Sequence, residues 1–163
     1  MAGDFSFDVV SDFDPQELRN ALDQARREIA TRYDFKGGLA EIVQEKDALA
    51  IRADSDLRAK AIRDLIESKA IRRSLSLKIF DWGPIEPAGG MTVRQHVGLQ
   101  RGLSDDLARK ITKILRDEHP RVKSQVQGDA VRVSAKSKDD LQKVIARLRE
   151  LDESVPLQFV NYR

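Results

Sequence analysis

The stretch at 27–38 combines side chains that bind phosphate with side chains that stack on bases. It reads Arg-Glu-Ile-Ala-Thr-Arg-Tyr-Asp-Phe-Lys-Gly-Gly, and its cations and rings are Arg27, Arg32, Lys36, Tyr33 and Phe35. Guanidinium and ammonium groups donate charge-assisted hydrogen bonds to phosphate, and an aromatic ring offers a flat face to a base or a cation. The stretch is therefore a candidate contact for a ligand that carries both groups.

The same residues also have a structural interpretation. Cations at a helix end interact favourably with the helix dipole, and Gly37 suits the position just after a helix. Tyr33 and Phe35 would then fill the hydrophobic core, where aromatic side chains are commonly found. The sequence alone leaves both interpretations open.

The elements around this stretch place it at a helix-to-strand turn. Asp14 is a typical N-cap, and Pro15 suits the first turn of the helix that follows. Leu18, Leu22 and Ile29 recur at helical spacing, which predicts a helix that ends near Arg32.

Two halves of the chain share one order of elements. Alternating and helical apolar patterns predict strand, helix, strand, strand, helix, strand in the first half, at 5–10, 15–32, 41–43, 48–53, 55–66 and 75–80. The second half repeats this order at 93–100, 104–115, 122–126, 131–133, 137–148 and 157–162. The pattern predicts an α+β protein built as an internal duplication of a ferredoxin-like unit, with two helices on a four-stranded antiparallel sheet.

The predicted boundary between the halves is rich in glycine and proline. Residues 83–90 read Gly-Pro-Ile-Glu-Pro-Ala-Gly-Gly, which no continuous helix tolerates. We therefore expect one repeat at 1–82, a linker at 83–91 and a second repeat at 92–163.

Composition argues against several classes of function. The 163 residues are 34% charged with a net charge of only +2, so the chain is not a polybasic nucleic-acid arm. It has no cysteine, which fits the cytosol, and no run of apolar residues long enough to span a membrane. His96 and His119 lack ligand-spaced partners, and no P-loop or Rossmann glycine motif is present. We expect no enzymatic activity, no metal and no cofactor.

Further basic residues could extend a binding surface. Arg94 shares one face of its strand with His96, Arg132 lies in a strand near Lys136, and Arg163 follows the last strand. A solvated sheet face explains them equally well. The central strands at 48–53 and 130–135 carry no aromatic residue, so stacking of bases on the open sheet face is not expected.

Several separated motifs resemble the YajQ family of bacterial proteins. They are the stretch at 27–37, Gln-Gly-Asp-Ala-Val-Arg-Val at 127–133, Asp-Asp-Leu-Gln at 139–142 and Pro-Leu-Gln-Phe-Val-Asn-Tyr-Arg at 156–163. The resemblance spans nearly the whole chain. It implies two ferredoxin-like domains of RNP topology that exchange N-terminal strands, so that 5–10 would join the second sheet and 93–100 the first.

The resemblance also implies a cytosolic nucleotide-binding protein without established enzymatic activity. Our first hypothesis is a non-catalytic binder of nucleotides, RNA or DNA, in which Arg32 and Lys36 contact phosphate while Tyr33 or Phe35 stacks on a base. The alternative is a cyclic di-GMP sensor that acts as a transcriptional co-regulator through a transcription factor.

Overall fold

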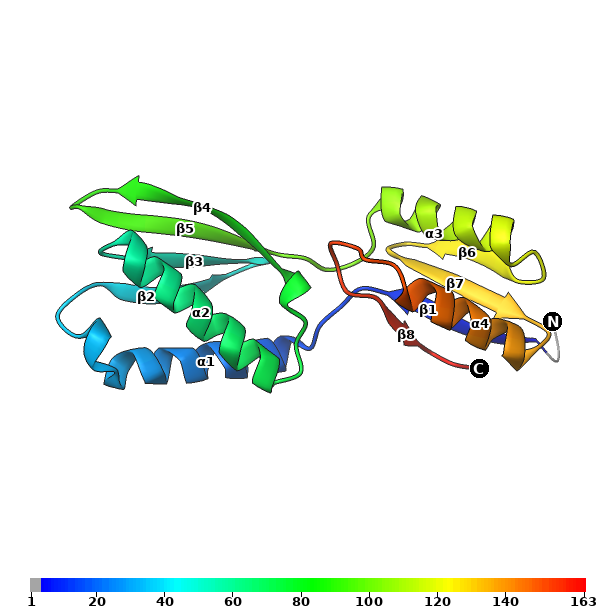
Figure 1. Cartoon of the computed structure of the whole chain (residues 1–163), viewed down its shortest axis with the longest axis horizontal. Helices are drawn as coiled ribbons and strands as arrows, with labels where there is room; N and C mark the ends of the chain where they lie inside the picture. The colour runs from blue at the N-terminus through cyan, green and yellow to red at the C-terminus, as the bar shows by residue number, and fades with distance from the viewer. Residues whose placement is uncertain (1–3) are drawn as a thin grey trace. The chain divides into compact units, whose positions relative to one another are not determined.

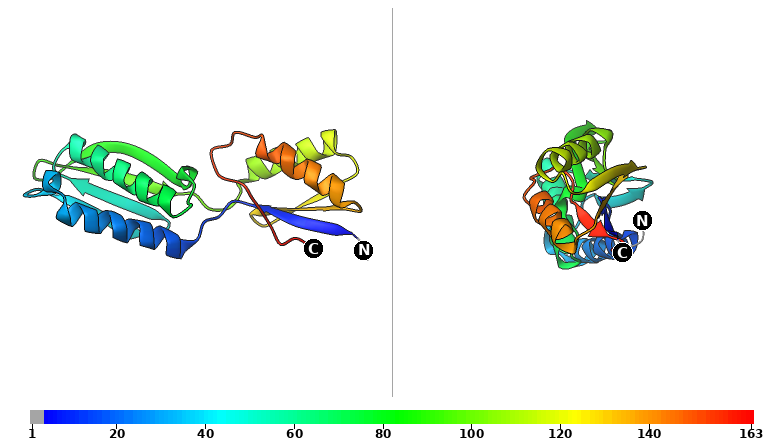
Figure 2. Two further views of the ribbon diagram at one scale, coloured as in Figure 1. Left: turned by 60° about the horizontal axis from the view of Figure 1, so that its bottom comes forward. Right: turned by 90° about the vertical axis from the view of Figure 1, so that its right-hand side faces the viewer.

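The computed structural model describes residues 4–163, and the chain divides into two units. The central unit is Phe13–Gln100, and the terminal unit combines residues 4–12 with Arg101–Arg163. Each unit has one four-stranded antiparallel sheet with two helices packed on it (Figures 1 and 2). This is the α+β architecture with two ferredoxin-like sheets that the sequence predicts.

The central unit holds the stretch at 27–38. Its sheet has the strand order β2-β3-β5-β4. Leu49 and Ile51 point from β3 into the core, where they meet Leu22 and Ile62 of the two helices. The elements are α1 (Pro15–Thr31), the 3₁₀ turn η1 (Tyr33–Phe35), β2 (Ala40–Glu45), β3 (Ala48–Ala53), α2 (Asp56–Arg72), the 3₁₀ turn η2 (Leu77–Ile79), β4 (Phe80–Ala88) and β5 (Thr92–Leu99).

The terminal unit has its own core. Its sheet has the strand order β6-β7-β1-β8, and Phe7 and Val133 pack from the sheet against Ile111 and Leu148 of the helices. The elements are β1 (Phe5–Val10), α3 (Asp105–Glu118), β6 (Lys123–Gln127), β7 (Ala130–Ala135), α4 (Lys138–Arg149) and β8 (Gln158–Val160).

The sheets are completed by exchanged strands. β1, the first strand in the sequence, pairs with β7 and β8, and β5 pairs with β3 and β4. Both exchanged strands lie in the interior of their sheets. The topology agrees with the strand exchange that the family resemblance implied.

The stretch at 83–91, expected as a linker, differs from that expectation. Residues up to Ala88 continue β4, which pairs with β5 through a register shift between Trp82 and Ile85. β4 is an edge strand, so Pro84 and Pro87 need no amide hydrogen for a second neighbour. The Gln95 side chain donates to the Gly83 carbonyl at 2.8 Å, which satisfies a backbone group at the irregularity.

Two predicted strands are also shorter or displaced. The strand predicted at 75–80 begins only at Phe80, because Ser76 caps the turn η2 by accepting from the Lys78 amide at 3.2 Å. The strand predicted at 157–162 ends as β8 at Val160, since Asn161 adopts a positive φ of 57°.

The helices begin close to the positions that the sequence predicted, and capping side chains fix their first turns. The Asp14 side chain accepts from the Gln16 amide at 2.9 Å, and Ser55 and Ser104 accept from amides in the first turns of α2 and α3. These caps fix where α1 and α2 start, and thereby which residues face the groove between them.

Candidate functional site

A polar groove runs between α1 and α2 on the central unit. We call it the α1–α2 groove. Its volume of about 680 Å³ falls within the usual range of ligand pockets, roughly 300–1,000 Å³. Four cations and two carboxylates are among the residues that line it, which are Glu17, Gln24, Arg27, Glu28, Thr31, Lys69, Arg72, Arg73 and Ser74.

Two of the four cations are already paired with the two carboxylates. Lys69 Nζ lies 3.3 Å from Glu28 Oε1, and Arg73 lies 3.6 Å from Glu17 Oε2. Lys69 is buried, with 8% of its surface exposed, so its ammonium needs the Glu28 carboxylate to offset desolvation. These pairs join the two helices and leave the remaining charge of the groove positive.

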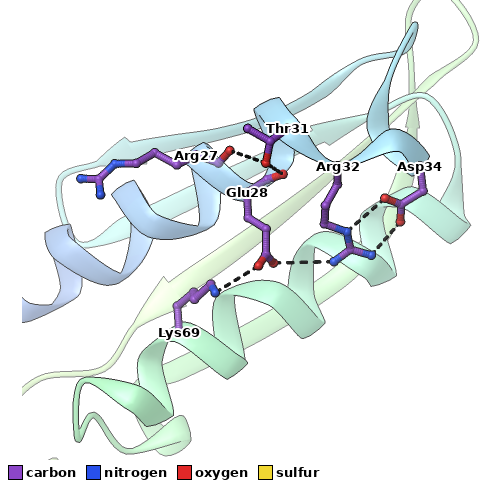
Figure 3. Close-up of polar contacts among 6 residues, drawn as sticks. All are labelled: Arg27, Glu28, Thr31, Arg32, Asp34 and Lys69. Carbon is purple, nitrogen blue, oxygen red and sulfur yellow. Dashed lines mark hydrogen bonds and ion pairs between the residues drawn. The ribbon is translucent and has the colours of Figure 1, made fainter.

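The other two cations, Arg27 and Arg72, are exposed at the groove. Within residues 4–163, neither guanidinium makes an ion pair or a hydrogen bond. Figure 3 shows the Arg27 guanidinium extending away from the ion pairs that Glu28 makes. Both guanidinium groups can therefore donate to an anionic ligand, and guanidinium geometry matches phosphate oxygens in pairs.

Arg32 belongs to a chain of ion pairs at the end of α1 (Figure 3). Its Nε and Nη2 atoms donate to the two Asp34 carboxylate oxygens at 3.0 and 2.7 Å, and Nη1 lies 3.7 Å from Glu28. The hydrogen bonds from Arg32 lower the pKa of Asp34 below its ordinary value. Arg32 thus closes the η1 turn and has two carboxylates as partners.

The two rings of the η1 turn have opposite environments. Phe35 is 5% exposed and belongs to the core of the central unit, and the Arg32 guanidinium lies 5.1 Å from its ring centre. Tyr33 is 87% exposed, and Lys36 Nζ lies 6.0 Å from its ring centre. Of the two rings in this turn, Tyr33 is the one that offers an exposed face beside a cation.

The remaining predicted site residues lie on other surfaces. Arg94 stands on β5 opposite Arg52 of β3 and Glu86 of β4. In the terminal unit, Arg132 donates to Asp8 at 3.0 Å, which lowers the pKa of that carboxyl. Lys136 lines a separate cavity of about 450 Å³, and Arg163 lines a third of about 350 Å³.

The structure therefore separates the nine predicted residues. Arg27 alone lines the α1–α2 groove, while Arg32, Tyr33, Phe35 and Lys36 form the adjoining turn. Lys69, Arg72 and Arg73, which line the groove together with Arg27, were not predicted from the sequence. Their signal is a basic last turn of α2 followed by Ser74, which a ferredoxin-like unit brings beside α1.

The described residues contain neither a candidate metal site nor a candidate membrane-spanning helix. Within residues 4–163, no three His, Asp or Glu side chains converge as ligands for a metal ion. No helix in that range is both long and apolar enough to cross a membrane.

Comparison with known proteins gives one consistent result. Residues 5–163 match the family described as "Nucleotide-binding protein YajQ-like". A nucleotide-binding protein of Thermosynechococcus vestitus is 53% identical over 163 residues, covering 100% of both chains. Nucleotide-binding proteins of Roseiflexus castenholzii and Trichodesmium erythraeum are 50% and 53% identical, again over 100% of both chains.

Proposed function

The chain belongs to the YajQ-like family, and from this premise we propose that it binds nucleotides through the α1–α2 groove without transforming them. The relatives described above are named nucleotide-binding proteins. The observation that carries the proposal is a pair of guanidinium groups, Arg27 and Arg72, that have no partner among the described residues and line a groove of about 680 Å³. They would hold the phosphates, while Lys69 and Arg73 stay engaged with the helix carboxylates.

The roles of the remaining lining residues follow from their chemistry. Thr31 donates its hydroxyl hydrogen to the carbonyls of Arg27 and Glu28, at 3.3 and 3.2 Å, so its oxygen serves as an acceptor for a ligand. The Gln24 amide can both donate and accept. A sugar hydroxyl or a base edge beside the phosphates would meet these two side chains.

Isothermal calorimetry with GTP, ATP and cyclic di-GMP tests the proposal. The Arg27→Ala/Arg72→Ala double variant should bind the preferred nucleotide at least tenfold more weakly, because each charge-assisted hydrogen bond contributes about 1.5–3 kcal/mol. Lys60→Ala is a matched control, since Lys60 is an exposed cation of α2 outside the groove. Unchanged affinity in a folded double variant would move the site elsewhere.

The rival location within the central unit is the η1 turn. There Tyr33 would stack on a base and Lys36 would contact phosphate. Loss of affinity in Tyr33→Ala/Lys36→Ala, with full affinity in the groove variant, would select this turn instead. Absence of turnover when the protein is incubated with nucleoside triphosphates and magnesium would support a non-catalytic role, whereas product formation would contradict it.

The ligand itself separates two forms of the proposal. If RNA or DNA is the ligand, affinity should fall steeply with salt, because binding releases counterions from the phosphates. A cyclic di-GMP sensor acting in the cytosol with a transcription factor is the second form, favoured by two free guanidinium groups for a ligand with two phosphates. Saturable binding of cyclic di-GMP, with none of GTP, would select it.

A further inference from the structure

A second cavity, chemically different from the α1–α2 groove, lies in the terminal unit. We call it the aromatic pocket. It has a volume of about 350 Å³, and Phe5, Leu141 and Tyr162 give it apolar walls while Lys138 and Arg163 add positive charge. Its residues come from β1, α4 and the segment after β8, which lie side by side in Figure 1.

Tyr162 is held at this pocket by the backbone around it. The chain leaves β8 through Asn161, which has a φ of 57°, and then returns to β1. Ser6 and Arg163 exchange two backbone hydrogen bonds, of 3.2 and 3.0 Å, and the Asn161 amide donates to Asp8 at 2.8 Å. A side chain on such a fixed backbone loses little conformational freedom when a ligand binds.

The ring of Tyr162 packs partly against Phe7 and is partly exposed to solvent. Its centre lies 6.0 Å from that of Phe7 at an interplanar angle of 37°, yet the residue is 58% exposed. Phe5 lies at the same pocket, with Lys138 Nζ 5.1 Å from its ring centre. Exposed aromatic faces of this kind stack on planar bases, and the contact is tolerant of base identity.

The polar groups of the pocket are available to a ligand. Within residues 4–163, neither Lys138 nor Arg163 makes an ion pair with a carboxylate, although the charge of Arg163 helps to lower the pKa of Asp8. Gln142 is exposed on α4, and its amide makes no hydrogen bond in that range, so it can both donate and accept. Aromatic rings alone would suit any apolar molecule, and cations alone would suit any anion. Here rings, cations and the Gln142 amide line the same cavity, which suits a ligand that carries both a base and a phosphate.

We propose that the aromatic pocket is a second nucleotide site, which takes the base of a nucleoside monophosphate against Tyr162 and its phosphate against Lys138 and Arg163. Gln142 reads the edge of the base. The site lies wholly within the terminal unit and uses no residue of the α1–α2 groove. The proposal of this second site is therefore independent of the function proposed for the α1–α2 groove.

Titration of the isotope-labelled full chain with AMP and GMP, followed by NMR, tests this site. We expect shifts to concentrate at Phe5, Ser6, Lys138, Gln142 and Tyr162. Adenosine and ribose 5-phosphate should each bind at least tenfold more weakly than AMP, because one lacks the phosphate and the other lacks the base. Equal binding of AMP and ribose 5-phosphate would overturn the role of the ring.

Variants assign the roles of ring and charge. Tyr162→Phe should keep the affinity for AMP and Tyr162→Ala should lower it about tenfold, since only the ring is required. Lys138→Glu should also lower it about tenfold, and this variant should fold because a carboxylate suits the first turn of α4. Lys143→Glu, on an exposed position of the same helix outside the pocket, is the control for charge.

Two further results would overturn the proposal. One is unchanged AMP affinity in Lys138→Glu, and the other is a set of shifts confined to the central unit. The Arg27→Ala/Arg72→Ala variant distinguishes the two sites, because it should keep the shifts at the aromatic pocket even if it loses binding at the groove. If that variant loses only the shifts at the groove, the aromatic pocket is supported. If shifts appear only at the groove in the parent chain, the groove alone is supported.

Discussion

Tyr33 and Phe35 stand two positions apart in the η1 turn, and their rings have opposite exposures of 87% and 5%. Replacing Phe35 by alanine removes a ring from the central core and leaves a cavity, so we expect a loss of about 3–5 kcal/mol in unfolding free energy. Tyr33→Ala should stay within about 0.5 kcal/mol of the parent chain. Urea unfolding followed by Trp82 fluorescence measures both.

Trp82 is a suitable reporter for this comparison. Its ring packs 5.7 Å from Phe80 and 4.7 Å from the Arg63 guanidinium, within the central unit. Equal losses in the two variants would mean that Tyr33 is also packed in solution, which would contradict its availability to a ligand.

Asp8 gives the terminal unit a dependence on acid pH. Hydrogen bonds from Arg132, at 3.0 Å, and from Asn161, at 2.8 Å, hold the pKa of Asp8 below its ordinary value of 3.8 against the opposing effect of burial. Such a carboxylate stabilises the fold fully above the ordinary value. That stabilisation declines as the pH falls below 3.8 toward the lower pKa of the folded state.

The Asp8→Asn variant should remove this acid-dependent part of the stability. At pH 7 we expect a loss of about 1–3 kcal/mol, because a hydrogen-bonded charge is deleted from a largely buried position. The difference from the parent chain should shrink between pH 4 and pH 2 in urea unfolding followed by circular dichroism. Asp117→Asn, at an exposed position of α3, is the control for the loss of one surface charge. A difference between Asp8→Asn and the parent chain that stays constant at all pH values would contradict the assignment to Asp8.

At the scale of elements, the segment between η1 and β2 is held by the side chain of Arg58, whose contacts we call the Arg58 clamp. Arg58 of α2 donates to the carbonyls of Phe35 and Lys36 at 3.2 and 3.3 Å, and it pairs with Asp54 at 3.2 Å. A Cβ atom at Gly38 would overlap the Asp54 carboxylate and the Arg58 guanidinium. The absence of a side chain at Gly38 therefore leaves room for the Asp54 and Arg58 side chains to pack against the backbone there.

The Gly38→Ala variant should lose about 1–3 kcal/mol of unfolding free energy, because Arg58 must move and release its hydrogen bonds. Trp82 fluorescence in a urea titration reports the change. Gly89→Ala is the matched control, since a Cβ there would meet no atom within 4 Å. A stability equal to that of the control would show that the clamp contributes nothing measurable.

The helices and hairpins were predictable because their signals are local. Asp14 and Ser55 cap helices by contacts within three residues, and the Gly128-Asp129 turn joins β6 to β7 as its residue types indicate. β4 was not predictable as a strand, because the tolerance for Pro84 and Pro87 depends on its place at the sheet edge. That place is set by pairing with a distant strand.

The candidate site was predictable only in part for the same reason. Arg27 was identified from the basic stretch, but its partners across the groove lie more than forty positions later, in the last turn of α2. The roles of Arg32 and Arg132 depended on which carboxylates lie beside them. Asp34 is a near neighbour of Arg32, whereas Asp8 reaches Arg132 only through the pairing of β1 with β7.

At the scale of the whole molecule, the exchanged strands decide which fragments are complete. Residues 13–100 contain all four strands of the central sheet and both of its helices. A cut at the glycine and proline stretch, giving residues 1–91, retains β1 but removes β5 from between β3 and β4. The shorter of these two fragments therefore has the more complete core.

We predict that a fragment of residues 13–100 folds cooperatively, whereas a fragment of residues 1–91 does not. β3 and β4 lie on either side of β5, so its loss opens the sheet and exposes Leu49 and Ile51 to water. Thermal unfolding, followed by circular dichroism and separately by Trp82 fluorescence, compares the two fragments. If 1–91 unfolds as cooperatively as 13–100, the strands pair within each half of the sequence in solution, and the exchange seen here is not required for folding.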